Sequence, residues 1–274
     1  MNEDLNAYYN KYNEDKRLTT PYGRVEFLTT MRYIERFIAG RNGLQILEAG
    51  AATGRYTLEL AARGHHITAV EPVRHSLGIL KQKAEREGLL GNIKAIQGDA
   101  RSMKKVRDSS QDIVLLFGPM YHLFTEEDKC AALREGARVL KPGGKLFAAY
   151  IMNEYAVVTF GFHEGHILES LEKGKLDENY HVRNTEEDLF SYDRLEDLDR
   201  YRRAAGLRRV LTVSQDGPVN YMREDFKEMS EEVFQEFLRY HFSVCERKDL
   251  LGASCHVVDI LEKRPLLRPG ILLA

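Results

Sequence analysis

Residues 44–56, LQILEAGAATGRY, hold the turn that decides the fold of this 274-residue chain. The first five residues form an apolar run of strand length, and a bend of small residues follows between Gly50 and Gly54. Small residues let the backbone turn tightly and let a ligand approach it, and the free amides at the start of the next helix point at that ligand. A strand, this bend and a helix therefore predict the first unit of an α/β domain with a ligand site at the bend.

Apolar runs of strand length alternate with helical patterns in the same part of the chain. The runs show little polar alternation, as is typical of strands covered on both faces, and they lie at 44–48, 66–71, 93–97, 112–117 and 145–151. Thr125 and Asp128 form a capping-box pattern at the start of the last intervening helix, and Pro142 is expected to end it. This alternation predicts a doubly wound, mostly parallel sheet with helices on both faces.

The other segments depart from this alternation. Residues 152–193 are irregular and rich in aromatic residues and histidine, and residues 223–247 look helical and strongly charged. A helix near 194–205 and strands at 208–214 and 256–263 complete the sheet. We expect one domain with a helical arm at 1–40, a core at 41–151, a cap insertion at 152–193, the rest of the core at 194–264 with a helical insertion at 218–252, and a tail at 265–274. The arm and both insertions are expected to cover the carboxyl edge of the strands.

Composition and charge narrow the class of protein. Lysine and arginine number 40 against 42 aspartate and glutamate, so the formal charge is −2, which argues against a dedicated nucleic-acid binder. No apolar run is long enough for a membrane span, and the acidic, polar start differs from a secretory signal. Cys130, Cys245 and Cys255 form no CxxC pair, so neither a disulfide framework nor a zinc knuckle is predicted. We expect a reduced, cytoplasmic protein.

Three acidic residues lie at the ends of consecutive predicted strands. Glu48 is in the first strand, Glu71 ends the second, and Asp99 follows the third. The carboxyl ends of parallel strands share one edge of the sheet, where the ligands of open α/β sheets bind, and an acid after the second strand can accept two hydrogen bonds from a ribose diol. The bend has the pattern GxxxG rather than GxGxxG, which disfavours a bound pyrophosphate and so a nicotinamide-dependent dehydrogenase.

Five motifs in order resemble the class I S-adenosylmethionine-dependent methyltransferases. They are ILEAGAATGRY (46–56), AVEP (69–72), GDA (98–100), DIVLLFGPMYHLF (112–124) and ARVLKPGGKLFAAYI (137–151). The resemblance implies a Rossmann-like sheet of seven strands whose last strand is inserted antiparallel. It implies S-adenosyl-L-methionine as methyl donor, S-adenosyl-L-homocysteine as product, and a small molecule as methyl acceptor.

The same resemblance implies roles for individual residues. Gly50 and Gly54 would pass close to the methionine part of the donor, and Glu48 would approach its amino group. Glu71 would hold the ribose hydroxyls, and Asp99 would accept from the adenine amino group. The further cofactor-binding residues that it implies are Ala51, Ala52, Pro72, Ala100, Phe117 and Gly118, with Tyr12 and Arg24 from the arm. Ala52 stands where the family has a glycine, which adds one methyl group near the ligand.

The residues after the fourth strand are the candidates for the acceptor side. The sequence Gly118-Pro-Met-Tyr121-His122 lacks the NPPY or DPPY motif of amine-N6 methylases and the Pro-Cys pair of cytosine-C5 enzymes. His122 is the candidate general base, because histidine titrates near working pH; the alternative is that it orients the loop or caps the next helix. Tyr121 either lines the acceptor pocket or packs in the core.

Other functions remain open from the sequence. An arginine cluster between residues 200 and 209 suits an RNA or tRNA methyltransferase, or it is a solvated edge that matches a helix dipole. A non-catalytic module that binds S-adenosylmethionine is the second alternative. His163 and His166 have no evident third ligand, so no metal is predicted. The oligomeric state, the acceptor and the methylated atom are not given by the sequence.

Overall fold

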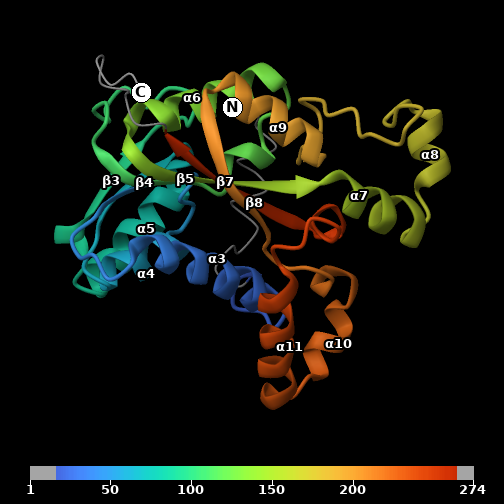
Figure 1. Cartoon of the computed structure of the whole chain (residues 1–274), viewed down its shortest axis with the longest axis horizontal. Coiled ribbons are helices and arrows are strands. Elements are labelled where there is room, and N and C mark those ends of the chain that lie inside the picture. The colour runs from blue at the N-terminus through green and yellow to red at the C-terminus, as the bar shows by residue number, and fades with distance from the viewer. Residues whose placement is uncertain (1–16, 264–274) are drawn as a thin grey trace, which may run out of the picture.

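Seven strands form one sheet in the computed structural model, which describes residues 17–263 (Figure 1). Along the sheet their order is β3-β2-β1-β4-β5-β8-β7. The strands are β1 (Gln45–Ala49), β2 (His66–Glu71), β3 (Ile93–Gln97), β4 (Gln111–Leu116), β5 (Leu140–Met152), β7 (Leu207–Ser214) and β8 (His256–Lys263). The two-residue β6 (Tyr192–Asp193) pairs with the end of β5.

The strand directions agree with the prediction. The strands β3, β2, β1, β4 and β5 pair in parallel, and β8 runs antiparallel to both of its neighbours, β5 and β7. The expected doubly wound α/β sheet of seven strands with an antiparallel last strand is therefore confirmed. Because the parallel strands all end on one side, their carboxyl ends meet along a single edge.

Helices cover both faces of the sheet. The first face is covered by α3 (Gly23–Ile38) and α4 (Arg55–Ala62), and the opposite face by α6 (Glu126–Val139) and α9 (Leu195–Ala204). The fifth helix of the core, α5 (Arg74–Arg86), packs beside β2 and β3. The apolar face of α3 is buried in this packing and consists of Phe27, Met31, Ile34 and Ile38.

Two predicted boundaries are wrong. Thr125 caps α6 by accepting from the Asp128 amide at 3.1 Å, but that helix ends at Val139 and β5 begins at Leu140, ahead of Pro142. The single charged helix expected at 223–247 is two helices, α10 (Arg223–Glu228) and α11 (Glu231–Val244). Met229 and Ser230 separate them: the extended backbone of Met229 ends α10, and the hydroxyl of Ser230 caps α11 by accepting from the amide of Val233.

The segments beyond the core project from the sheet (Figure 1). After β5 come α7 (Asn153–Ala156), a π-helical turn (Val157–His163) and α8 (Ile167–Glu172). Helices α10 and α11 share a small apolar cluster with α3. All three cysteines are buried free thiols. None of the helices within residues 17–263 combines the length and the apolar character needed to cross a bilayer.

Candidate functional site

Two cavities lie at the carboxyl ends of β1, β2 and β4. The larger, of about 670 Å³, is lined by Glu71, Asp99 and His122 among others, and we call it the Asp99 cavity. The smaller, of about 360 Å³, is lined by Glu48, Tyr121 and His256 among others, and we call it the His256 cavity. Gly50, Ala52 and Gly118 line both cavities. A ligand longer than either cavity would therefore pass these three small residues.

The two cavities share a wall where Gly50, after β1, packs against Gly118, after β4, and we call this contact the Gly50–Gly118 neck. A Cβ atom on Gly50 would lie 2.7 Å from Cδ of Pro119 and 3.1 Å from Cα of Gly118. The backbone of Gly50 also has a φ of 75°, which side chains rarely adopt. The structure therefore requires glycine here. Gly54 lines neither cavity; its missing side chain makes room for Leu80 of α5.

Glu71 holds the bend after β1 in place. Its carboxylate accepts from the amide of Ala52 at 2.9 Å and from the amide of Val73 at 2.9 Å. Ala52 has a left-handed φ of 44°, so this bond stabilises the one position where the family pattern has glycine. Each oxygen can accept a further hydrogen bond, because a carboxylate accepts about four. Burial raises the pKa of Glu71.

Asp99 lies on the far wall of the same cavity, together with Pro72 and Ala100. Its carboxylate pairs with Arg101 at 2.7 Å, and Arg101 also pairs with Asp128 at 2.9 Å. Partial burial opposes ionisation of Asp99, but the bonds and charge of Arg101 outweigh it and lower its pKa. Asp99 is therefore an ionised carboxylate on the wall of this cavity.

Glu48 forms part of the floor of the His256 cavity. It is 2% exposed, and its carboxyl group accepts from the hydroxyl of Thr57 at 2.5 Å. Burial raises the pKa of Glu48 to about 8. Ala51 and Phe117 line the same cavity. Of the cofactor-binding residues that the resemblance implies after β1 and β4, only Gly54 does not line it.

Tyr121 and His122 face different cavities. Tyr121 lines the His256 cavity, where its ring centroid lies 5.7 Å from that of His256. His122 lines the Asp99 cavity, and its Nδ1 donates to the carbonyl of Leu189 at 2.9 Å. Burial lowers the pKa of His122. This placement favours the interpretation of His122 as a residue that orients the 186–190 segment over that of a base.

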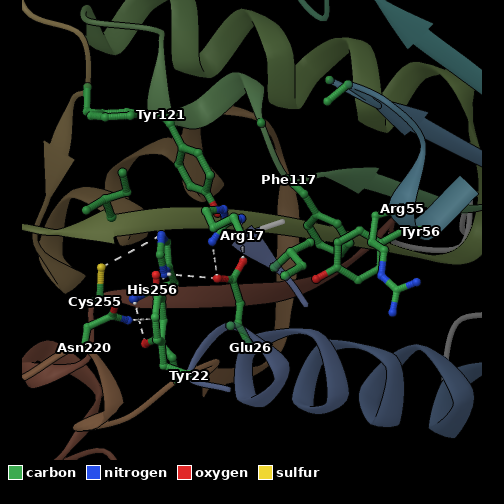
Figure 2. A pocket seen from close by; sticks show the side chains of 18 of the residues that line it. Arg17, Tyr22, Glu26, Arg55, Tyr56, Phe117, Tyr121, Asn220, Cys255 and His256 are labelled. Carbon is green, nitrogen blue, oxygen red and sulfur yellow. Dashed lines mark hydrogen bonds and ion pairs between the residues drawn. The ribbon is translucent and has the colours of Figure 1, made fainter. Parts of the chain in front are cut away.

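A charged cluster in the His256 cavity was not predicted from the sequence (Figure 2). His256, the first residue of β8, lies between Asp216 and Glu26, with its Nδ1 2.6 Å from Asp216 and 3.6 Å from Glu26. Glu26 also pairs with Arg17 at 2.5 Å. Glu26 belongs to α3, Arg17 precedes that helix, and Asp216 and His256 stand at the two ends of the β7–β8 connection, so no local motif joins them.

The described arm residues that line a cavity differ from those expected to reach the cofactor. Arg24 pairs with Glu231 at 2.9 Å and lies over the ring of Phe234, so it ties α3 to α11 and lines neither cavity. Arg17 and Tyr22 line the His256 cavity instead. Tyr12 lies outside the described residues.

The arginine cluster is neutralised within the protein. Arg200 pairs with Asp197, Arg202 and Arg203 with Asp199, Arg208 with Glu262, and Arg209 with Asp199 and Asp259. None of these arginines lines either cavity. His166 stacks on Phe160 and contacts Glu169. The arginines therefore act as partners of carboxylates at the edge of the sheet.

Comparisons with known proteins agree with this geometry. Residues 46–144 match a family model described as a methyltransferase domain. The core of this chain is therefore a methyltransferase domain of the class I S-adenosylmethionine-dependent type. The methyltransferase core is 36% identical over 107 residues to the cypemycin N-terminal methyltransferase of a Streptomyces species, a match that covers 39% of this chain and 41% of that protein.

Two further proteins extend the comparison. The ubiquinone biosynthesis O-methyltransferase of Methylocella silvestris is 30% identical over 137 residues, which is 48% of each chain. The chain thus matches less than half the length of either curated relative. A solved S-adenosylmethionine-dependent methyltransferase from Methanosarcina mazei has a TM-score of 0.58 at 15% identity, over 85% of this chain and 98% of that one, which shows the shared fold.

Proposed function

We propose that this protein transfers a methyl group from S-adenosylmethionine to a small molecule bound in the His256 cavity. The observation that supports this most is the pair of adjacent cavities that share the Gly50–Gly118 neck as a wall, each of which is lined by acidic side chains. An adenosyl group bonded to a methionine is a long ligand with polar groups at both ends. It fits a site in which only backbone separates two polar cavities.

The residues of the Asp99 cavity would hold the adenosine part of the donor. Glu71 has unused lone pairs for the ribose hydroxyls, and the ionised Asp99 accepts from an amino group such as that of adenine. Beyond the neck, Glu48 and the backbone at Gly50 and Ala51 would border the methionine part. When bound, the donor supplies a methyl carbon on a sulfonium, which is already a good leaving group.

The protein's main contribution is then to hold acceptor and donor in line. Such positioning can supply roughly 7–11 kcal/mol of an activation barrier. The acceptor side of the His256 cavity combines the aromatic residues Tyr121, Tyr155, Phe190 and Tyr192 with polar groups. This lining suits a small, partly apolar acceptor. Phe162, which is 59% exposed, does not line the cavity and would not contact such an acceptor.

An RNA acceptor has less support. Its sequence argument was the arginine cluster, and those arginines pair with carboxylates away from both cavities. Binding to RNA phosphates needs lysine or arginine side chains that are available to replace the counterions of the phosphates. One curated relative is named for N-terminal methylation of cypemycin and the other for O-methylation in ubiquinone biosynthesis, so their names do not identify the acceptor of this chain.

Calorimetric titration with S-adenosylhomocysteine tests the donor site. Asp99→Ala and Glu71→Gln should each weaken its affinity at least about tenfold, because each removes an acceptor for a polar ligand group. Asp108→Ala is the matched control: Asp108 also pairs with an arginine, Arg138, but lies outside both cavities. Unchanged affinity in both site variants, or tighter binding of NADH than of S-adenosylhomocysteine, would contradict the proposed function.

A further inference from the structure

Asp216 and His256 form a buried carboxylate–imidazole pair on the acceptor side of the His256 cavity. Nδ1 of His256 donates to Oδ2 of Asp216 at 2.6 Å, and both side chains line the cavity. Asp216 is 1% exposed and also accepts from the amide of His256 and from the side chains of Ser254 and Asn220. Four donors therefore hold the carboxylate in one orientation, and the carboxylate in turn sets the orientation of the imidazole ring.

The other imidazole nitrogen, Nε2, has only a weak partner. The sulfur of Cys255 lies 3.9 Å from it, a long hydrogen bond to a weakly bonding thiol that a polar group of a ligand can replace (Figure 2). The ring of Tyr121, which follows the Gly50–Gly118 neck, packs against the His256 ring. The imidazole thus lies on the same side of the neck as the space assigned to the acceptor, and its bond to Asp216 sets its orientation.

We propose that Asp216 and His256 act as a dyad in which His256 removes the proton from the group that becomes methylated, an inference that rests on the proposed function. The acceptor is then a hydroxyl or an amine that still carries a proton when it reacts. The X–H bond of the acceptor breaks, its electron pair stays on X, and the proton moves to Nε2 of His256. Asp216 stays ionised and stabilises the resulting imidazolium, as a carboxylate does in other histidine-based sites.

The charges around His256 set when it can act as a base. From α3, Glu26 faces it and is bound to Arg17; from the β7–β8 connection come Asp216 and Cys255; and Tyr121 contacts it from the loop after β4. Burial alone would lower the pKa of His256, but Cys255, Glu26 and Asp216 outweigh burial and raise it well above the usual value. Before ligands bind, His256 therefore carries a proton near neutral pH.

A cation in the joined cavities should remove that proton. A bound sulfonium disfavours a second positive charge beside it, so it lowers the pKa of His256. The uncharged thioether of S-adenosylhomocysteine has no such effect. Binding of the donor would therefore convert His256 into a base, whereas binding of the product would not. This difference is measurable without knowing the acceptor.

A metal ion is the competing use of the same atoms. Asp216, Cys255 and His256 are a group of three described residues whose ligand atoms lie within 4.8 Å of one another. The oxygens of Asp216 are already occupied by four hydrogen-bond donors, which leaves only a thiol and one imidazole nitrogen. Catalytic zinc usually has three protein ligands, so the geometry favours the dyad.

Calorimetry in buffers of different ionisation enthalpy, between pH 6.5 and 9, counts the protons released on binding. We expect the binding of S-adenosylmethionine to release up to one proton more than the binding of S-adenosylhomocysteine. The ratio of the two affinities should then shift in favour of S-adenosylmethionine by at most about tenfold for each unit by which the pH rises. His256→Gln should abolish the difference, and Asp216→Asn should move it to lower pH. His181→Gln is the control, because His181 also pairs with a carboxylate, that of Asp197 at 3.1 Å, outside the cavity.

The outcomes separate the dyad from the function on which it rests. Wild-type protein that binds neither ligand overturns both. Equal proton release with the two ligands, or a difference that survives in His256→Gln, overturns the dyad and leaves the methyl-donor site intact. Titration with Zn²⁺ alone completes the test: binding that wild type shows and His256→Gln lacks would assign the cluster to a metal and overturn the dyad. Asp216→Asn retains the imidazole, so it reports even if His256→Gln does not fold.

Discussion

Tyr121 and His122 are consecutive in the sequence but line different cavities, one on each side of the Gly50–Gly118 neck. The short 3₁₀ turn η2 (Pro119–Tyr121) produces this divergence, because it ends between them. A loop that follows β4 thus contributes to the proposed acceptor side and to the proposed adenosine side at once. Substitution of these neighbours should consequently affect different ligands.

His122→Ala should weaken the affinity for S-adenosylhomocysteine about three- to tenfold. The substitution removes the hydrogen bond that holds the Leu189 carbonyl, and a bond of this kind contributes roughly 0.5–1.5 kcal/mol. Tyr121→Phe should change that affinity less than about twofold, since it keeps the ring contact with His256. Titration calorimetry of both variants is the measurement. Equal losses in the two would show that the neck does not separate two sites.

Gly50→Ala should abolish donor binding while the control Gly88→Ala does not. Both glycines have a left-handed φ, 75° and 71°, so the backbone strain of the substitution is matched. A Cβ on Gly50 meets Pro119 and Gly118, whereas a Cβ on Gly88 has no atom within 4 Å. We expect a similar loss of folding stability from backbone strain in both variants, a further loss from these close contacts in Gly50→Ala, and a loss of S-adenosylhomocysteine binding only in Gly50→Ala. If Gly50→Ala binds normally, the ligand does not cross the neck.

The donor side was predictable because its residues belong to local patterns. Glu71 and Asp99 follow strands that the apolar runs reveal, and parallel strands necessarily bring their ends together. The dyad was not predictable in this way. Asp216 and His256 meet because β8 enters the sheet antiparallel between β5 and β7, and neither residue stands in a recognisable motif. That Arg17 rather than Arg24 lines the cavity was not predictable, because the spacing of residues in the arm does not show which side chain turns toward it.

Lys129→Met should destabilise the fold by about 3–5 kcal/mol, because it leaves Asp193 buried without a counter-charge. Lys129 on α6 and Asp193 on β6 are each 1% exposed, with Nζ 2.6 and 2.5 Å from the two carboxylate oxygens. Adding Asp193→Asn should restore much of the loss. Lys141→Met, which breaks the more exposed pair with Asp112, should cost at most about 1 kcal/mol. Urea unfolding compares the three, and equal costs for the two lysines would contradict the argument.

Glu48→Gln should change how stability depends on pH. Burial raises the pKa of Glu48 from its usual 4.5 to about 8, so the folded state binds more protons than the unfolded state between these values. The stability of the wild type therefore falls as pH rises through this window, and the glutamine variant lacks that contribution. Unfolding in urea at pH 5, 6, 7 and 8 should show the variant gaining stability relative to wild type at each step. The surface substitution Glu127→Gln should follow the wild-type profile, and a constant difference between Glu48→Gln and wild type would mean that Glu48 is ionised throughout and is stabilised by Thr57 alone.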